Sequence, residues 1–473
     1  MTLHEQLQRY FGYETFRPGQ QDVIEAVLRG EDVVAVLPTG MGKSLCYQLP
    51  TKLLPHATLI VSPLLSLMQD QVEQLKKMGE KRAVALNSFL NRAEKEQVLA
   101  TIAQYEFIFT SPEMLQQPRV RAMLERLPLS LIVVDEAHCL SQWGFDFRPD
   151  YLQIIDAFKA PRPPVLALSA TATTRVLADI KHYLQLQQPF ELLHSVDRPN
   201  IRLMREHFDT QEQKLAWAFS YAAVAQGAGI FYTQSRKKCE QYARALVERG
   251  VRVAYYHAGM DIYDRQLIQQ QFLAEELDWV VATNAFGMGV HKANIRHVLH
   301  DVFPATVANY MQEIGRAGRD GEPSIAVLLY AQGDEQLVTY VATEDVPSDM
   351  HVELYVQQQD PLELVRSGMM RETQFRVLHY WLQQKNVQEV KHLLAGLRLE
   401  KREQIEAMRC IVQQTTCIRE AVVAAFGQQL HMRPPQCCTN CKATYELHVT
   451  HEKKASLAMD ATWQERLNAL FPL

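Results

Sequence analysis

A lysine and a serine close the segment Pro38-Thr39-Gly40-Met41-Gly42-Lys43-Ser44. Its glycines would let backbone N–H groups approach phosphate oxygens, and a following helix N-terminus would add a favourable dipole. In such a loop Lys43 would reach the β- and γ-phosphates of a nucleotide, and Ser44 would bind Mg²⁺. Leu37 stands where the usual first glycine would be, so the segment alone is a partial match to a phosphate-binding loop.

Two adjacent carboxylates complete this chemistry further along the chain. The apolar run Leu131–Val134 leads directly into Asp135-Glu136-Ala137-His138. Asp135 would hold Mg²⁺ through water, and Glu136 would polarise an attacking water molecule. An Asp-Glu pair after a strand is by itself typical of a solvated loop, but together with Gly-Lys-Ser it predicts hydrolysis of a nucleoside triphosphate.

Two further segments suit the same chemistry, and each has a simpler explanation. The hydroxyl side chains of Ser169–Thr173 could link the state of the nucleotide to the rest of the protein, or they could cap a helix. The glycine-rich segment Gln312–Gly321 carries Arg316 and Arg319. An arginine from a neighbouring domain stabilises the charge of a phosphoryl-transfer transition state, whereas the alternative here is a solvated basic turn.

Short β-branched runs alternate with helical patterns over the first 345 residues and must position these side chains. They are Asp32–Leu37, Thr58–Val61, Phe107–Thr110, Leu131–Val134 and Val165–Leu168, then Gly229–Thr233, Val251–Tyr256, Trp279–Thr283, Val298–Val302 and Ala326–Tyr330. Buried strands alternating with helices are typical of parallel α/β sheets. We therefore predict two similar α/β domains in tandem, with a boundary near Asp197–Ile201.

Composition limits the remaining possibilities. A chain of 473 residues suggests about three domains, and 47% hydrophobic with 22% charged residues excludes a mainly disordered, collagenous or coiled-coil protein. The formal charge of −5 requires any polyanion site to be a local basic cleft. The N-terminus lacks the apolar core of a signal peptide, and no apolar run approaches the ~20 residues of a membrane span. We expect a soluble protein of a reducing cytoplasm without a membrane partner.

The eight cysteines fall into two groups. Cys46, Cys139 and Cys239 are isolated in apolar segments, which predicts inert core thiols. The other five lie between Cys410 and Cys441, and such local crowding in a large chain favours a metal site over disulfides.

The order of the motifs resembles that of RecQ-family DNA helicases of superfamily two. The segments that carry this resemblance are Phe11–Gln20, Pro38–Ser44, Ser62-Pro63-Leu64, Asp135–His138, Ser169–Thr173, Tyr256–Gly259, Ala282–Gly289 and Gln312–Gly321. The resemblance is close over residues 1–345 and weaker afterwards. It implies two RecA-like domains that bind ATP between them, translocation in the 3′-to-5′ direction on single-stranded DNA, and duplex unwinding in repair, recombination or fork processing.

The most specific segment is Ser141–Pro149, which resembles the aromatic-rich loop that couples DNA binding to ATP hydrolysis in RecQ helicases. Its DNA-contacting candidates are Gln142, Trp143, Phe145, Phe147 and Arg148. Aromatic rings stack on unpaired bases, and an arginine binds phosphate. The alternative is that these rings pack into the core, but Gly144, Asp146 and Pro149 interrupt any helix or strand period and favour a loop.

The resemblance implies roles for individual residues. Tyr13 and Arg17 would sandwich adenine, Gln20 would hydrogen-bond its edge, and Thr39, Gly40, Met41, Gly42, Lys43 and Ser44 would bind the phosphates. The catalytic set would be Lys43, Asp135, Glu136, His138, Gln312, Arg316 and Arg319, with Mg²⁺ as cofactor. Along the DNA strand would lie Ser62, Thr110, Ser111, His257, Thr283 and Phe286, which position the strand without reading its sequence.

The zinc candidates are Cys417, Cys437, Cys438 and Cys441, because the family has a similar Cys-to-Phe-Gly helix followed by a cysteine cluster. Four thiolates satisfy a closed tetrahedral site. Since the adjacent Cys437 and Cys438 would both have to reach one ion, His431 or His448 could replace one of them.

The C-terminal part departs from the longer members of the family. Residues 350–430 are predicted to be mostly helical, with core positions at Trp381, Leu382, Leu393, Leu394 and Leu397. Only about thirty residues follow Cys441, too few for a winged-helix domain. We divide the chain into residues 1–200 and 201–345 (the two RecA-like domains), 346–405 (helical connection), 406–455 (zinc-binding subdomain) and 456–473 (tail).

The chain is therefore similar to the shorter bacterial RecQ type. The resemblance implies binding of single-stranded and forked or branched DNA, interactions with single-strand-binding and repair proteins, and a place at the bacterial nucleoid. An RNA helicase of the same superfamily and an ATP-gated DNA clamp with little unwinding are the alternatives.

Overall fold

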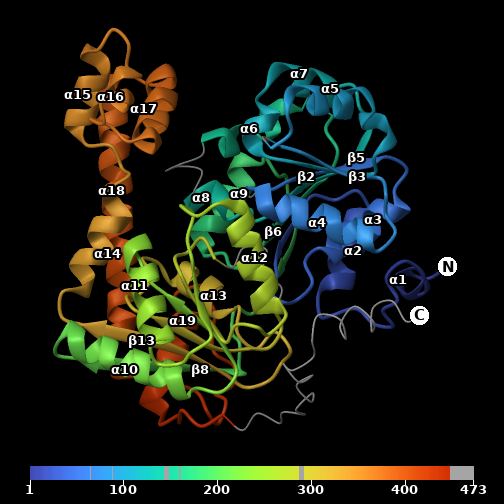
Figure 1. Cartoon of the computed structure of the whole chain (residues 1–473). Helices are drawn as coiled ribbons and strands as arrows, with labels where there is room; N and C mark the ends of the chain where they lie inside the picture. The colour runs from blue at the N-terminus through green and yellow to red at the C-terminus, as the bar shows by residue number, and fades with distance from the viewer. Residues whose placement is uncertain (64, 88, 143–148, 159–160, 287–291, 448–473) are drawn as a thin grey trace, which may run out of the picture.

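Two wholly parallel sheets follow one another along the chain. The computed structural model describes residues 1–447 except 64, 88, 143–148, 159–160 and 287–291 (Figure 1). Each sheet is covered by helices on both faces, as expected for strands that are apolar throughout. The prediction of two tandem α/β domains followed by a helical region is thus confirmed.

The first sheet has seven strands and positions the phosphate loop. In spatial order they are β3 (Ala83–Leu86), β4 (Phe107–Thr110), β2 (Ala57–Val61), β5 (Leu129–Val134), β6 (Val165–Ser169), β1 (Val33–Val36) and β7 (Phe190–Leu193). Strands β1 and β5 both flank β6, with Ala35 paired to Leu168 and Val133 to Leu166. Because all three run parallel, the segments that follow β1, β5 and β6 emerge at the same edge of the sheet.

The second sheet has six strands. In spatial order they are β10 (Val253–Tyr256), β11 (Trp279–Ala282), β9 (Ala228–Tyr232), β12 (Ile295–His300), β13 (Ser324–Ala331) and β8 (Ile201–Phe208). Buried side chains from both faces of this sheet form two clusters, one of which continues into the C-terminal helices and cysteines. The C-terminal region is therefore packed onto the second domain rather than tethered to it.

The helices of the two α/β parts connect these strands. They are α1 (Leu3–Phe11), α2 (Gln20–Leu28), α3 (Leu45–Leu53), α4 (Leu65–Lys77), α5 (Arg92–Ala100), α6 (Pro112–Leu115), α7 (Pro118–Leu124), α8 (Cys139–Gln142), α9 (Thr174–Tyr183), α10 (Gln211–Val224), α11 (Arg236–Val247), α12 (Ile262–Leu273), α13 (Val307–Ile314) and α14 (Asp334–Thr343). Short 3₁₀ turns lie at Ile102–Gln104, Pro149–Gln153 and Ile155–Ala157.

A single long helix organises the C-terminal region. Helix α18 (Val387–Gln413) has 27 residues, about 40 Å at 1.5 Å per residue, and it begins at a capping box in which Asn386 and Glu389 bond reciprocally. At its upper end α15 (Asp349–Gln357), α16 (Glu363–Arg366) and α17 (Glu372–Gln384) form a compact group, here called the helical head (Figure 1). At its lower end follow α19 (Ile418–Ala424) and the 3₁₀ turn η4 (Thr439–Cys441).

The helical head and α18 also contact the first domain. Leu152 belongs to the same buried cluster as Trp381 and Leu394, two of the predicted core residues. On α18, Glu400 forms an ion pair of 2.9 Å with Arg175 of α9. The head and its supporting helix therefore touch both α/β domains.

Three strands were not predicted from the sequence. Strands β3 and β7 are the two edges of the first sheet. Half of the residues of β3 are only partly buried, and in β7 partly buried residues alternate with exposed ones, so the apolar signal is weak. Strand β8 begins at Ile201, within the predicted boundary, and contains Arg202, Arg205 and Glu206. Its charged residues are accommodated because the C-terminal segment packs along this edge and accepts hydrogen bonds from both arginines.

The predictions of buried cysteines and leucines agree with the described residues. Cys46, Cys139 and Cys239 are all buried among apolar side chains. Leu382, Leu393 and Leu397 are partly buried against the cluster that contains Trp381. Within the described part of the chain, no helix is both long and apolar enough to cross a membrane.

A buried ion cluster ties α10, β12 and α14 together. Lys214 Nζ lies 2.9 Å from both carboxylate oxygens of Asp334 and 3.3 Å from Asp301 Oδ1, and the lysine is fully buried. Removing one partner of a buried ion pair leaves uncompensated charge in the core.

We expect Lys214→Met to lower the free energy of unfolding of the second domain by about 3–5 kcal/mol, because two carboxylates would lose their buried cation. Lys238→Met is the matched control, since Lys238 also pairs with Asp301 (3.2 Å) but is partly exposed. Denaturant titration followed by tryptophan fluorescence would measure both. Equal effects of the two substitutions would contradict the importance of the buried pair.

Candidate functional site

The phosphate loop follows β1 and leads into α3. Gly40 and Gly42 have φ of 89° and 72°, a left-handed conformation that glycine adopts without strain. Lys43 Nζ lies 3.3 Å from Oε1 of Glu136, which follows β5. The loop thus presents backbone and a lysine at the edge where β5 ends.

The two carboxylates follow β5 at this edge. Glu136 interacts through its second oxygen with His138 Nδ1 at 3.4 Å. Burial, together with the charge of Glu136, raises the pKa of Asp135. Burial also opposes ionisation of Glu136, but the charges of Lys43 and His138 outweigh it and lower the pKa of Glu136. The site therefore holds Glu136 as the ionised partner of Lys43.

The backbone at Glu136 is strained. Its φ is 49°, a left-handed value that costs a non-glycine residue about 1–3 kcal/mol. The neighbouring residues are held by hydrogen bonds to adjacent strands, Asp135 N–H to the carbonyl of Val61 and Ala137 N–H to that of Leu168. The sheet thus fixes the direction of the Glu136 side chain, and strain of this kind clusters at functional sites.

A hydrogen-bonded chain leads away from the carboxylates. His138 Nδ1 lies 3.1 Å from Ser169 Oγ, which donates to the carbonyl of Thr171 at 2.6 Å. Burial lowers the pKa of His138. Thr173 caps α9 by accepting a hydrogen bond from Val176 N–H. Both explanations of Ser169–Thr173 thus have a structural counterpart, with Ser169 and Thr171 in the chain and Thr173 at the helix.

Two arginines of the second domain face the first across the cleft. The turn that carries Arg316 and Arg319 follows α13, and the side chain of Arg319 lies against Gly40. Arg316 and Arg319 both interact electrostatically with Glu136. Burial, followed by the charges of Arg316 and Arg198, lowers the pKa of Arg319 to about 10. Gln312 lies on the same side of the cleft, beside Pro38, Thr39 and Thr171.

Two of the residues expected around adenine contact the backbone of the phosphate loop. Tyr13 is 58% exposed, so its ring is accessible. The guanidinium of Arg17 donates to the carbonyl of Gly40. Gln20 is buried, and its amide donates to the carbonyls of Met41 (2.9 Å) and Gly42 (3.0 Å). In this structure Gln20 therefore supports the phosphate loop directly.

The residues of the first domain that are predicted to contact DNA include three at the carboxyl ends of β2 and β4. Ser62 is buried, and its hydroxyl has no hydrogen-bond partner among the described residues. Thr110 donates to the carbonyl of Leu86, and Ser111 caps α6 by accepting from Met114 N–H. Gln142 ends α8. Trp143, Phe145, Phe147 and Arg148 lie outside the described residues.

The residues of the second domain that are predicted to contact DNA differ from one another in burial. His257 is buried beside Tyr255, with Nε2 3.4 Å from Glu240. Thr283 is partly buried at the end of β11. Phe286 differs from the prediction, because its ring is fully buried between Tyr256 and Phe272 and is not available for stacking on a base. Its aromatic character is explained by core packing.

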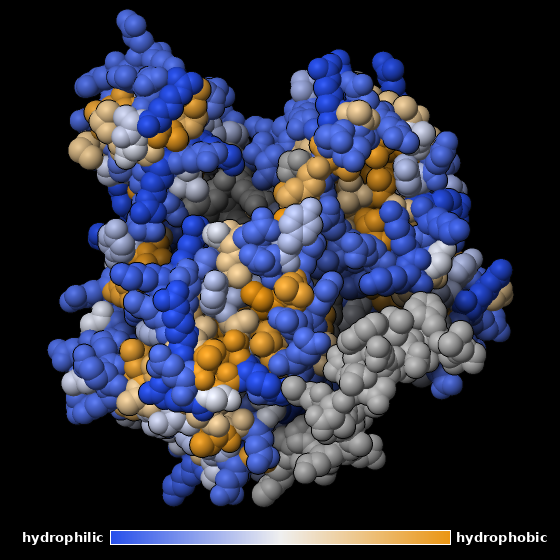
Figure 2. All heavy atoms as spheres, in the orientation of Figure 1, coloured by the Kyte–Doolittle hydropathy of each residue, from blue (hydrophilic) through white to orange (hydrophobic). Residues whose placement is uncertain are grey.

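A cavity of about 580 Å³ opens between the two domains, α14 and α17–α18. Its walls include Glu113, Ser141 and Asn284, each one or two residues from a strand-contact candidate. Figure 2 shows this face of the molecule hollowed between the helical head and the first domain. Sequence neighbours of predicted strand contacts in both domains therefore border a common space.

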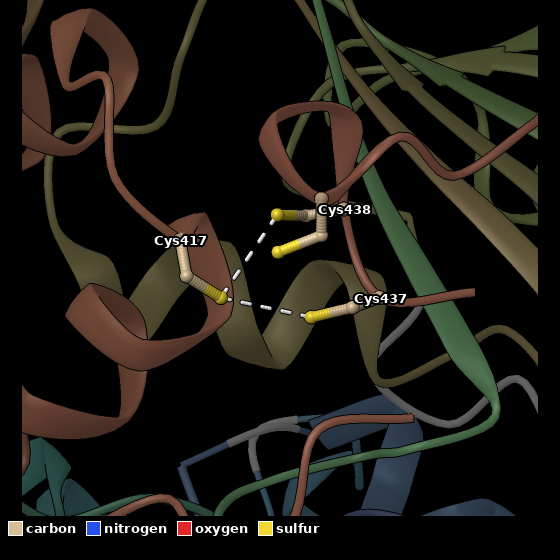
Figure 3. Close-up of side chains that lie close together, drawn as sticks. Cys417, Cys437 and Cys438 are labelled. Atoms are coloured by element: carbon tan, nitrogen blue, oxygen red, sulfur yellow. Dashed lines mark hydrogen bonds between the residues drawn. The ribbon is translucent and has the colours of Figure 1, made fainter. Parts of the chain in front are cut away.

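The four predicted zinc ligands come together on α19 and η4. Cys417 precedes α19, and Cys437 and Cys438 lie on the turn that leads into η4 (Figure 3). Cys441 is the last residue of η4. All four sulfur atoms lie within 4.8 Å of one another, with 3.6 Å between Cys417 and Cys437 and 4.0 Å between Cys417 and Cys438. Four thiolates at about 2.3 Å from one zinc ion would be about 3.8 Å apart, so this donor set fits zinc.

Both adjacent cysteines belong to this cluster, so neither needs to be replaced. His431 is exposed and is not a member of the cluster. His448 lies outside the described residues. Cys410, the fifth cysteine of this region, is exposed on α18, away from the other four.

Sequence analysis missed two arginines of the site region, Arg198 and Arg419. Arg198 lies between the domains and donates to backbone carbonyls on both sides of the cleft. Arg419, on α19, is 1% exposed and donates to the carbonyl of Arg198 at 2.9 Å. Their partners are mostly carbonyl groups, which leave no pattern in a sequence.

Comparison with known proteins agrees with this arrangement. The DEAD/DEAH box helicase model matches residues 17–180, and the helicase conserved C-terminal domain model matches residues 213–321. Among solved structures, S. cerevisiae Dbp5 bound to RNA and ADP BeF3 has the same fold, with a TM-score of 0.59 and 15% identity over 72% of this chain and 90% of that one.

Two curated relatives are more similar in sequence. The probable ATP-dependent DNA helicase RecS of Bacillus subtilis is 42% identical over 100% of this chain and 98% of that protein. The ATP-dependent DNA helicase RecQ of Haemophilus influenzae is 42% identical over 69% of this chain, and the match spans 53% of that longer protein. Similarity at this level, over nearly the whole length of one relative, identifies the family: the chain belongs to the RecQ family of ATP-dependent DNA helicases.

Proposed function

We propose that this protein uses ATP hydrolysis to translocate in the 3′-to-5′ direction along single-stranded DNA and to unwind duplex DNA. The observation that carries the proposal is the ion pair of Lys43 and Glu136 in the first domain, faced across the cleft by Arg316 and Arg319 of the second. This is the arrangement that phosphoryl transfer requires, since charge on the transferred group must be stabilised from both sides.

Each charged group would have one role in the reaction. Lys43 would leave Glu136 for the β- and γ-phosphates, which frees the carboxylate to orient and polarise the attacking water. Arg316 and Arg319 would approach the γ-phosphate as the cleft closes. Asp135 and Ser44 would hold Mg²⁺, which supplies positive charge to the phosphate oxygens when bound.

The hydrogen-bonded chain from His138 to Thr171 would couple the state of the bound nucleotide to the binding of the DNA strand. Glu136 contacts His138, and His138 contacts Ser169. A change in the charge around Glu136 would therefore affect the segment after β6, where Thr171 lines a small pocket together with Gln312 of the second domain. Reopening of the cleft after hydrolysis would then move one domain relative to the other along the strand.

DNA is proposed as the substrate because both curated relatives described above are named DNA helicases. The strand would cross the two domains beside the 580 Å³ cavity, contacted by Ser62, Thr110, Ser111, His257 and Thr283, and by Gln142 and the neighbouring aromatic segment. Forked or branched DNA and single-strand-binding and repair proteins at the bacterial nucleoid are the proposed partners. A fold shared with an RNA-bound helicase makes RNA the alternative to be tested.

The four-cysteine cluster is proposed to hold one zinc ion with a structural role. The site is closed by four thiolates, which leaves no coordination position for a substrate. Zinc would supply folding energy to a segment that lies against β8. Its function would be to fix α19 and η4 to the second domain.

The proposed activity predicts ATPase stimulation by single-stranded DNA but not by RNA of equal length, and unwinding of a forked duplex. Lys43→Ala should abolish hydrolysis while the fold is retained, and Glu136→Gln should bind ATP without turning it over. Lys52→Ala is the matched control, because Lys52 lies on α3, the helix that follows the phosphate loop, and pairs with Glu80 and Glu106 outside the site. Near wild-type turnover by Lys43→Ala would show that the phosphate-loop assignment is wrong.

The arginine role predicts a separate kinetic signature. Because an arginine of this kind acts on the transition state, Arg319→Ala should reduce kcat by ~10³–10⁵ and leave ADP affinity within a few-fold of wild type. Arg252→Ala, which removes an exposed arginine paired with Asp278, serves as the control. Steady-state ATPase assays and titration with a fluorescent ADP analogue would measure both quantities, and parallel loss of kcat and affinity would exclude a transition-state role.

The zinc proposal predicts about one zinc ion per chain in protein purified without chelators. Cys417→Ser or Cys441→Ser should lose the metal and make the segment after α18 sensitive to protease, whereas Cys410→Ser should retain both metal and protection. Elemental analysis and limited proteolysis would measure these outcomes. Metal retained after Cys437→Ser, but lost after Cys438→Ser, would mean that only one of the adjacent cysteines is a ligand.

A further inference from the structure

The guanidinium of Arg198 joins the two sides of the nucleotide cleft. Nη1 donates to the carbonyls of Thr39 and Gly315, both at 3.2 Å, and Nη2 donates to those of Ala317 (3.1 Å) and Gly318 (2.8 Å). Thr39 belongs to the phosphate loop, and the other three belong to the turn that carries Arg316 and Arg319. One side chain therefore fixes the distance between the loop and the turn.

The phosphate loop and the turn that carries Arg316 and Arg319 lie very close to each other. Thr39 Oγ1 donates to the carbonyl of Gly315 at 2.8 Å, and a Cβ atom at Gly315 would lie only 2.5 Å from that hydroxyl. At the far end of the turn Gly318 has a left-handed φ of 56°, and Asn200 donates to its carbonyl at 2.9 Å. The turn is thus shaped to receive hydrogen bonds from Arg198 and its neighbours.

Arginine is the side chain suited to this position. A guanidinium carries five N–H donors in a rigid plane, whereas a lysine ammonium is a compact group with three donors. Four carbonyls on two segments require donors that point in different directions from one planar group. Because these partners are carbonyls, Arg198 keeps its positive charge at the cleft, although burial lowers its pKa.

A second arginine, Arg419, fixes the backbone of Arg198. Arg419 Nη1 lies 2.5 Å from Asp197 Oδ1 and donates to the carbonyl of Arg198 at 2.9 Å. Its Nη2 donates to the carbonyl of Ile201 and to that of Cys437 at 3.3 Å. Arg419 lies two residues after Cys417 and donates to the carbonyl of Cys437, so it contacts the four-cysteine cluster directly.

The geometry points to Arg198 as a positioning residue for ATP hydrolysis, held in place from the four-cysteine cluster through Arg419. This inference rests on the proposed ATPase function and extends it, because it connects a structural cluster in the C-terminal region to the placement of Arg316 and Arg319. A displacement of about 1 Å can cost about a hundred-fold in rate when a transition-state contact is lost. Arg198 would act on the rate of hydrolysis and not on nucleotide binding.

The test compares Arg198→Met, Arg198→Lys and Arg419→Met with Arg202→Met. Arg202 is the matched control, since it lies on β8 and donates to the carbonyls of Thr444 (2.8 Å) and Glu446 (2.5 Å), but has no partner at the cleft among the described residues. DNA-stimulated kcat, KM for ATP, affinity for a fluorescent ADP analogue and zinc content are measured for each variant.

We expect Arg198→Met to lower kcat ten- to a hundred-fold, with ADP affinity within three-fold of wild type and zinc retained. Arg198→Lys should recover part of the loss, and Arg419→Met should lower kcat less, also without loss of zinc. The double variant Arg198→Met/Arg419→Met should be no slower than Arg198→Met alone, because Arg419 acts through Arg198. Arg202→Met should keep kcat within two-fold.

Three results would overturn the inference. Unchanged kcat in Arg198→Met would remove the positioning role, and parallel loss of kcat, ADP affinity and zinc would reduce it to general stability. Additive losses in the double variant would separate Arg419 from Arg198. Absence of ATPase activity in the wild-type protein would instead contradict the proposed function, so the two failures are distinguishable.

Discussion

Charge buried between two sheets is the constraint on which the arrangement of this protein depends. Lys43 and Glu136 neutralise each other in the first domain, while Arg198, Arg316 and Arg319 bring three positive charges to the same cleft. Buried charge of one sign is unfavourable unless an opposite charge is near, and the pKa of Arg319 is lowered by burial first and then by the charges of Arg316 and Arg198. The negative charge of a triphosphate would offset it, so the cleft is electrostatically suited to its expected ligand.

The framework around the cleft resists this repulsion through backbone contacts. Glu136 is held in a strained left-handed conformation by the strands on either side of β5. Arg198 donates hydrogen bonds to carbonyl oxygens of the turn that carries Arg316 and Arg319. Carbonyl groups accept hydrogen bonds without neutralising the guanidinium. The cations are therefore fixed in position while their charges remain directed at the site.

The sequence predicted the parts of this arrangement that depend on side-chain type and missed those that depend on backbone. Gly-Lys-Ser, Asp-Glu-Ala-His and the cysteine spacing identify chemistry that few other residues perform, and the alternation of apolar runs identifies parallel sheets. Arg198 and Arg419 bind carbonyl groups brought together only by the tertiary fold. Phe286 illustrates the opposite error, because an aromatic residue beside a strand-contact motif can serve the core.

The C-terminal helices contact the two domains with different strength. Arg419 and Asp197 form a buried pair that fixes α19 to the segment leading into β8, whereas Arg175 and Glu400 form a partly exposed pair that joins α18 to α9 of the first domain. Exposed pairs typically contribute ~0–1 kcal/mol and break readily, while breaking buried ones leaves uncompensated charge. When the cleft opens and closes, α18 should therefore move with the second domain, and the apolar contact of Leu152 with the helical head would have to shift. The shape of the 580 Å³ cavity beside the proposed path of the DNA would then change with each cycle of hydrolysis, because α17 and α18 form part of its wall.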